Sequence, residues 1–222
     1  MTDWRDHSLR EKERYKDGER RLPDAEDHDA RQRQLTRMGN AAAGAALAEL
    51  MGGNTDSAGE WFARAIERYR ESYALAPPGS WGRLIGIVKA RILAGDWHGA
   101  EDDSRWTLDE GAAEAESPIG RYAACLALLV LGRDEQARAL ADGLRTPEGF
   151  PAPVGDALAF ICAQDVVGYA VAIEEVLRSF EKREEYLEDI PVADTVLVLQ
   201  GLAARRGMGA ELSSPLLPRT GV

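Results

Sequence analysis

Histidines and cysteines are the side chains of this sequence best suited to metal binding or nucleophilic catalysis. His7, His28 and His98 lie far apart, and none belongs to the i, i+4 pair of a zinc-binding helix or to the Glu-x-x-His motif of a di-iron bundle. Cys125 and Cys162 lie in apolar segments, where a thiol behaves as a small hydrophobic group. The sequence therefore predicts neither a bound metal nor a reactive thiol.

Motifs for phosphate binding and acyl transfer are absent from the sequence. Gly52 and Gly53 are not followed by the Lys-Ser or Lys-Thr pair of a phosphate-binding loop. There is no dinucleotide-binding glycine fingerprint and no nucleophile elbow. We therefore expect a protein that is not an enzyme and that uses no cofactor, with an enzyme of unrecognised type as a remote alternative.

Positively charged side chains lie between apolar residues in the segment 82–94, which has the spacing of a helix. In stacks of helix pairs, the first helix of each pair lines the concave surface. The side chains that would form a cradle there for a carboxylate or an acidic peptide are Trp81, Arg83, Lys89, Arg91 and Arg121. The alternative is that these cations pair with neighbouring acids such as Asp96 and Glu101.

Acidic side chains cluster in the next segment of the sequence. The members of this cluster are Glu101, Asp102, Asp103 and Asp109. An exposed acidic face of this kind would steer a basic partner, as an inhibitor of a basic nuclease would do. The alternative is a solvated helix face in an acidic protein. Paired carboxylates also serve as acid and base in glycoside hydrolysis, but that chemistry requires a cleft that raises one pKa.

Charge and composition narrow the classes of partner. The 222-residue chain has 38 acidic and 27 basic side chains, and its formal net charge of -11 repels nucleic-acid backbones. The N-terminus has no apolar signal segment, and no apolar run approaches the roughly 20 residues that span a bilayer. We expect a cytoplasmic protein with a protein or peptide partner, and neither nucleic acid nor membrane as a ligand. The sequence leaves the oligomeric state open.

A repeated pattern of glycine and alanine predicts how the fold positions these residues. Three times a helix-like apolar run ends at a glycine and an alanine follows five positions later, at Gly53 and Ala58, Gly95 and Ala100, and Gly132 and Ala137. Glycine adopts the left-handed conformation that commonly ends a helix, and alanine lets the next helix pack closely. A degraded fourth copy is centred on Gln164 and Asp165. The pattern predicts an all-α fold of antiparallel helix hairpins, with about nine or ten helices.

The predicted helix boundaries follow from these turns. The helix pairs occupy 27–51 with 57–75, 82–94 with 97–110, 118–131 with 134–144, and 153–163 with 166–186. A helix over 192–205 is expected to cap the stack, before an extended tail over 208–222. Residues 1–26 are rich in charge and poor in large apolar groups, which predicts a flexible arm or one marginal helix. Residues 27–222 are expected to form a single helical-repeat domain.

The hairpin pattern over 27–186 resembles the tetratricopeptide repeat class, in which a glycine turn and small residues at fixed offsets set the packing of two helices. The large residue early in the first helix and the closing proline recur only in part, for example as Trp81 and Pro77. This resemblance implies an α-solenoid that binds a peptide or protein on its surface. We therefore expect a non-catalytic adaptor or scaffold.

A second pattern occupies 191–218, where a helix precedes a short strand-like segment, a serine and a Leu-Pro pair. Its residues are Pro191, Leu197, Leu199, Leu202, Ala203, Arg206, Gly207, Ser214, Pro215, Leu216, Leu217 and Pro218. This pattern resembles the end of the immunity protein 49 family of bacterial toxin systems. The resemblance implies a helical protein that neutralises a cognate toxin and has no catalytic residues. An inhibitor of this type, acting through the acidic face, is the alternative function.

Overall fold

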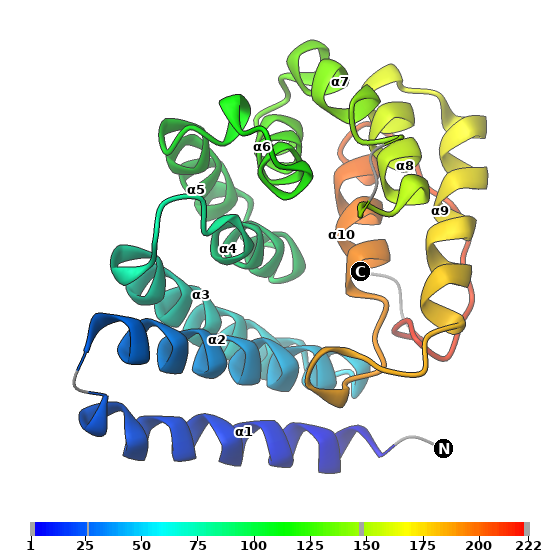
Figure 1. Ribbon diagram of the computed structural model, residues 1–222. Helices are drawn as coiled ribbons and strands as arrows, with labels where there is room; N and C mark the ends of the chain where they lie inside the picture. Colours follow the sequence, from blue (N-terminus) through cyan, green and yellow to red (C-terminus); the bar gives the residue numbers. More distant parts are fainter. Residues whose placement is uncertain (1–2, 26, 147–148, 220–222) are drawn as a thin grey trace.

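The computed structural model describes residues 3–25, 27–146 and 149–219, and within these ranges the fold is entirely helical, as predicted (Figure 1). The α-helices are α1 (Trp4–Arg21), α2 (His28–Met51), α3 (Thr55–Leu75), α4 (Trp81–Leu93), α5 (Trp97–Asp109), α6 (Pro118–Val130), α7 (Asp134–Asp142), α8 (Ala152–Ala163), α9 (Val166–Glu181) and α10 (Asp194–Ala204). Short 3₁₀ turns lie at Leu22–Asp24, Ala112–Glu114 and Leu187–Asp189. Consecutive helices pack on one another, which is the arrangement of a helical-repeat fold.

The predicted glycine turns separate α2 from α3, α4 from α5, and α6 from α7. Gly53, Gly95 and Gly132 have φ angles of +80°, +70° and +70°, the left-handed conformation that glycine adopts without steric cost. The alanines that follow are buried, at Ala58, Ala100 and Ala137. In the fourth pair, Gln164 takes the left-handed conformation at +52°, and Asp165 caps α9 by accepting a hydrogen bond from a backbone N–H. The hairpin prediction is therefore confirmed.

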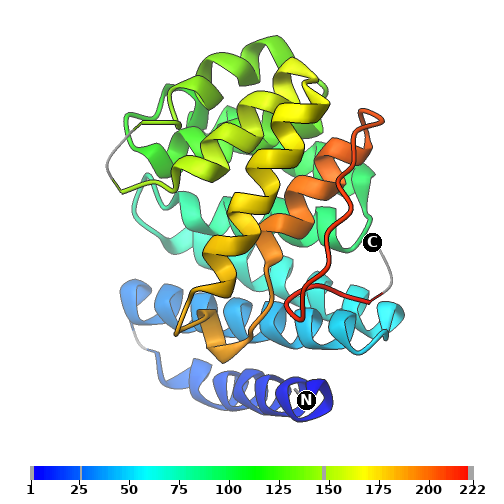
Figure 2. The ribbon, with the colours of Figure 1, turned by 90° about the vertical axis from the view of Figure 1, so that its right-hand side faces the viewer.

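Helix α1 occupies most of the charged N-terminal segment and packs along α2 (Figure 2). The side chain of Asp3 caps its first turn. Tyr15 is 1% exposed, and its ring meets the ring of Trp61 edge-on, with 5.4 Å between the centroids. Tyr15 is thus an aromatic anchor for a helix that is otherwise mostly charged, and Ser8 and Lys12 add contacts to Glu49 of α2. Residues 1–2 and 26 of this segment lie outside the described ranges.

The helix predicted over 166–186 ends at Glu181 instead. The hydroxyl of Tyr186 donates a hydrogen bond to the carbonyl oxygen of Phe180 at 2.7 Å, so the chain turns back over the end of the helix. Residues 182–193, which we call the α9–α10 connection, then pass beside α2 before α10 begins. This connection forms part of the candidate site described below.

Helix α10 lies on the inside of the curve that the other helices form (Figure 1). It packs against α8 and α9 and also reaches back to α4. Six of its eleven residues are buried, which is expected for a helix that is apolar on most of its faces. The predicted C-terminal helix therefore both caps the last pair and joins it to the second.

The tail after α10 follows an extended path beside α9 and α10 (Figure 2). The backbone N–H of Ala193 donates a hydrogen bond to the carbonyl oxygen of Leu216 at 3.0 Å. The side chains of Met208, Leu216 and Leu217 are buried in the core. These contacts hold residues 208–219 against the helices.

Candidate functional site

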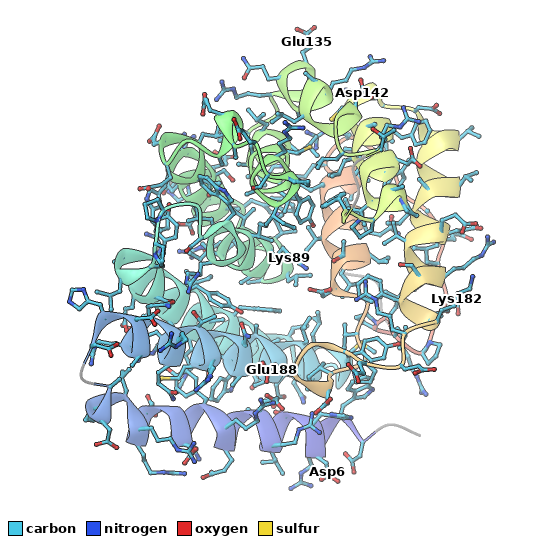
Figure 3. The ribbon with its side chains drawn as sticks, viewed as in Figure 1. Asp6, Lys89, Glu135, Asp142, Lys182 and Glu188 are labelled. Atoms are coloured by element: carbon cyan, nitrogen blue, oxygen red, sulfur yellow. The ribbon has the colours of Figure 1, made fainter. Side chains whose placement is uncertain are left out.

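A pocket of about 480 Å³ lies between α2, α3 and α4 on one side and the α9–α10 connection on the other. Figure 3 labels Lys89 on α4 and Glu188 on the connection, which both line this pocket. Its volume falls within the range of about 300–1,000 Å³ that is typical of ligand-binding pockets. We call it the central pocket.

Most of the pocket lining is apolar, and its main apolar side chains are Leu47, Phe62, Ile85, Leu93, Ile190 and Val192. Tyr69 also lines the pocket, with its ring held between two glycines. A Cβ atom at Gly39 would lie 2.7 Å from this ring, and one at Gly86 would lie 2.8 Å from it. The Tyr69 hydroxyl donates a hydrogen bond to Oδ1 of Asn40 at 2.9 Å, and burial raises the pKa of Tyr69 above its usual value. The ring is therefore a fixed, uncharged part of the lining.

Arg83 brings a positive charge into the pocket from α4. Its Nε donates a hydrogen bond to Oγ of Ser72 at 2.7 Å, and a terminal nitrogen donates to Oε1 of Gln32. Both partners are buried and neutral. Burial lowers the pKa of Arg83, and no carboxylate forms an ion pair with it in the part of the chain that the structure describes. Its orientation is fixed, but its charge is not neutralised.

Lys89 also points into the pocket from α4, but its charge is paired. Its Nζ forms an ion pair with Asp194 at the start of α10 and donates a hydrogen bond to Oγ1 of Thr195 at 3.2 Å. Glu188 on the α9–α10 connection is likewise paired, with Arg14 of α1. Both carboxylates that line the pocket are therefore committed to cations.

Arg183 supplies the remaining pocket charge from the α9–α10 connection. Its guanidinium lies over the ring of Phe180, 3.6 Å from the ring centroid. Across the described residues it has no ion pair with a carboxylate. Of the three cations that line the pocket, Lys89 is paired, and Arg83 and Arg183 have no carboxylate partner among the described residues, although the protein is strongly acidic.

The structure brings together two of the five residues predicted for the cradle, Arg83 and Lys89. Residues two positions apart in an α-helix are related by a rotation of about 200°. Arg91 therefore points away from Lys89, and it pairs with Asp96 and Asp103. Pairing with a neighbouring acid was the alternative for these cations, and Arg91 follows it.

The other two predicted cradle residues, Trp81 and Arg121, make contacts at α6 and at the segment that precedes it. Trp81 packs its indole Nε1 close to Gly120, where an added Cβ would lie 2.8 Å from it. Nε of Arg121 donates a hydrogen bond to the carbonyl oxygen of Ala115 at 3.3 Å. Neither side chain lines the central pocket.

The predicted acidic face loses its central member, because Asp103 is fully buried. Asp102 pairs with Arg105 at 2.9 Å, and Glu101 lies 3.4 Å from Arg105 and 3.6 Å from Arg205. Most of the negative charge of this cluster is therefore matched within the protein. Only the fourth member, Asp109, is both exposed and without an ion pair among the described residues.

Asp96 gives stability a specific dependence on pH. The backbone N–H of Gly99 and the guanidinium of Arg91 stabilise its carboxylate and hold its pKa below the usual value. A carboxylate with a lower pKa in the folded state adds stability above its unfolded pKa of about 4, and this contribution is lost as pH falls through the folded value.

Urea unfolding at neutral pH and at about pH 3 tests this assignment. The fall in the free energy of unfolding between the two pH values is expected to be smaller for Asp96→Asn than for the wild type. Asparagine still caps the helix, and Asp109→Asn is the control. Equal losses in wild type and Asp96→Asn would contradict this assignment.

The pocket residues that sequence analysis missed come from segments far apart in the chain. Tyr69 belongs to an apolar stripe typical of core packing, and Asn40 lies within an alanine-rich run. Arg183 and Glu188 fall in a stretch that was predicted to be helix or its end. Only the curvature of the helix stack brings these side chains to one cavity. Their individual surroundings in the sequence contain no signal for it.

The predicted absence of a metal site and the buried thiols can be compared with the structure directly. Among the described residues, no three His, Cys, Asp or Glu side chains are placed to hold a metal ion. Cys125 and Cys162 are both buried and free, and the hydrogen bond that the Cys125 thiol donates toward Cys162, together with burial, raises the pKa of Cys125. No helix in the described ranges has both the length and the apolar character needed to cross a bilayer.

Comparisons with protein-family models, with curated proteins and with solved structures give no match.

Proposed function

We propose that this protein is a non-catalytic binding module that holds a peptide segment of a partner protein in its central pocket. The observation that carries this proposal is the pair of guanidinium groups, Arg83 and Arg183, that line a largely apolar pocket without a carboxylate partner in the described chain. Arg83 is half-buried, and a half-buried charge without a counter-ion costs free energy, whereas Arg183 is exposed to solvent. A ligand that supplies the missing anion recovers it.

The ionisable groups of the pocket support binding rather than catalysis. A general base must be able to take up a proton near the working pH. The carboxylates of Glu188 and Asp194 are held by Arg14 and Lys89, and the Tyr69 hydroxyl is held by Asn40. Each of these groups has a structural partner already.

The helical-repeat architecture is a second support for a peptide-binding role. Stacked helix pairs present concave surfaces on which a few variable side chains select the partner. The central pocket lies on the concave side, where α4 and the α9–α10 connection face each other. The inhibitor of a basic toxin receives less support, because the acidic face it requires is largely paired internally.

Selection of a displayed random-peptide library against the immobilised protein tests this proposal. Selected peptides are expected to bind Arg83→Glu at least about tenfold more weakly than the wild type, since the variant reverses the charge of the pocket. Arg138→Glu is the matched control, because Arg138 is exposed on α7 and has no ion pair among the described residues. Enriched peptides that bind both variants equally would place the interface elsewhere. Failure to enrich any peptide would contradict a peptide-binding module.

A further inference from the structure

We propose that the group held in the central pocket is a carboxylate attached to an apolar residue of the partner. This inference rests on the proposed function and adds the chemistry of the ligand. It follows from the state of Arg83, the position of Arg183, the net charge of the pocket and the apolar lining, which are taken in turn below.

Arg83 is built to present its charge and not merely to fill space. Ser72 is fully buried and Gln32 is nearly so, and both accept hydrogen bonds from the guanidinium. These two neutral acceptors fix its plane while leaving donor N–H groups uncommitted, since a guanidinium has five such donors. A planar group with paired donors matches the two oxygens of a carboxylate.

Arg183 lies on a different wall of the same pocket. One face of its guanidinium is stacked on Phe180, which leaves the edge that carries its N–H donors available. Arg83 comes from α4 and Arg183 from the α9–α10 connection. Two separate elements therefore supply guanidinium donors to the pocket.

The net charge of the lining favours a singly charged ligand. Arg83, Lys89 and Arg183 carry three positive charges, and Glu188 and Asp194 carry two negative ones. Lys89 pairs with Asp194, Glu188 pairs with Arg14, and Arg183 is exposed to solvent, so Arg83 is the one half-buried charge of the lining that has no counter-ion. A carboxylate carries one negative charge and balances it. A phosphate carries a charge of about −1.5 to −2 at neutral pH, and its second charge would face two carboxylates. The pocket therefore suits a carboxylate better than a phosphoryl group.

The apolar part of the lining defines what the carboxylate is attached to. Leu47, Phe62 and Ile85 lie on one side, and Ile190 and Val192 lie on the other. Burying an apolar side chain among these groups contributes about 1.5–3 kcal/mol in transfer free energy. An acidic or chain-terminal residue next to a leucine-sized residue would satisfy both the charged and the apolar lining.

The probes that test this inference share a leucine side chain and differ in whether and where they carry a carboxylate. N-acetyl-leucine carries a terminal carboxylate, N-acetyl-leucyl-aspartate amide carries a side-chain carboxylate, and N-acetyl-leucinamide carries none. Each is titrated into isotope-labelled protein while the amide signals of residues around the pocket are followed by NMR. We expect both acids to shift these signals and to bind at least about tenfold more tightly than the amide. The tighter of the two acids identifies whether the source is a chain end or a side chain.

Three variants connect this binding to the pocket. Arg83→Gln is expected to remove the preference for the acid, and Ala43→Trp is expected to remove binding altogether by filling the space. Arg138→Gln should behave as the wild type. Melting temperatures of all variants confirm that each one is folded.

The inference is overturned if the amide binds as well as the acids, if inorganic phosphate displaces them at equal ionic strength with higher affinity, or if no probe shifts the pocket signals at about 20 mM. If library peptides bind the pocket equally well as acids and as amides, the proposed function stands and only the inference of a carboxylate ligand is wrong. If the acid probes bind while no library peptide is enriched, the pocket binds a carboxylate but the proposed peptide-binding function is wrong. The two failures are therefore distinguishable.

Discussion

Replacing Asp103 with alanine is expected to lower the free energy of unfolding by about 3 kcal/mol. Asp103 is 0% exposed and accepts hydrogen bonds from Arg70 of α3 and from Arg91 of α4, so it joins three helices from its position on α5. Removing a partner from a buried ion pair costs about 3–5 kcal/mol. The lower end applies here because both arginines reach partly into solvent.

The two arginines make this loss harder to absorb. Burial and the positive charge of Arg91 lower the pKa of Arg70. With Asp103 absent, the two guanidiniums lose the carboxylate that they share, and Asp96 remains as a partner of Arg91 only. We therefore expect the contact between α3 and α4 to loosen as well as the contact with α5.

Urea denaturation at constant ionic strength measures this effect. The matched control is Asp102→Ala, which removes the adjacent carboxylate, 60% exposed and paired with Arg105 on the surface. An exposed pair of this kind contributes about 0–1 kcal/mol. If the two variants lose similar stability, Asp103 does not have the structural role assigned to it.

The sequence does contain a signal for the burial of Asp103, although the prediction placed this residue on an exposed acidic face. Ala100, Asp103, Ser104 and Thr107 share the i, i+3, i+4, i+7 spacing of a buried helix stripe, and all four are buried. A stripe built mainly of polar residues is easily mistaken for a solvated face. Its meaning depends on Arg70, which lies more than thirty positions away in the sequence.

The helix hairpins were predictable because glycine marks each turn locally. Gly53, Gly95 and Gly132 end helices for a reason that lies in their own backbone freedom. The end of α9 was not predictable in this way. Glu188 and Asp189 of the α9–α10 connection adopt φ angles of +55° and +54° without being glycine, so tertiary contacts hold them there.

The central pocket was predictable only on one of its walls. Arg83 and Lys89 both belong to α4, and the helical period of that segment is readable from sequence. The opposite wall consists of Arg183, Tyr186 and Glu188, which reach the pocket only because α10 folds back toward α4. Sequence patterns predict the helices, but they do not predict the curvature of the helix stack that places these two walls opposite each other.

Two arginines of α1 contact the left-handed residues of the α9–α10 connection. A terminal nitrogen of Arg10 donates hydrogen bonds to the carbonyl oxygens of Glu188 at 2.9 Å and Asp189 at 3.4 Å, and Arg14 pairs with the Glu188 carboxylate. A left-handed conformation costs about 1–2 kcal/mol for each non-glycine residue. The two arginines therefore offset backbone strain in a segment that forms one wall of the pocket.

Replacing both arginines with glutamine, Arg10→Gln with Arg14→Gln, is expected to release this connection while the rest of the fold remains intact. Both arginines also pair with the buried Glu11, so the two substitutions are made and compared in a Glu11→Gln background, which leaves no unpaired carboxylate buried in α1. Glutamine is shorter than arginine, so the contacts to the connection are lost. Hydrogen bonds from charged donors contribute about 1.5–3 kcal/mol, which corresponds to amide exchange faster by about ten- to a hundredfold.

Hydrogen exchange resolved along the chain measures this release. Amides of the connection should exchange faster in the double variant, whereas those of α6 and α9 should not change. Arg5→Gln with Arg20→Gln removes the same charge from the same helix without touching the connection, and serves as the control. Faster exchange throughout α1 and α2 would instead mean that the arginines hold α1 itself in place. Unchanged exchange in the connection would show that its left-handed residues are held by other contacts, and α1 would then have no influence on the pocket wall.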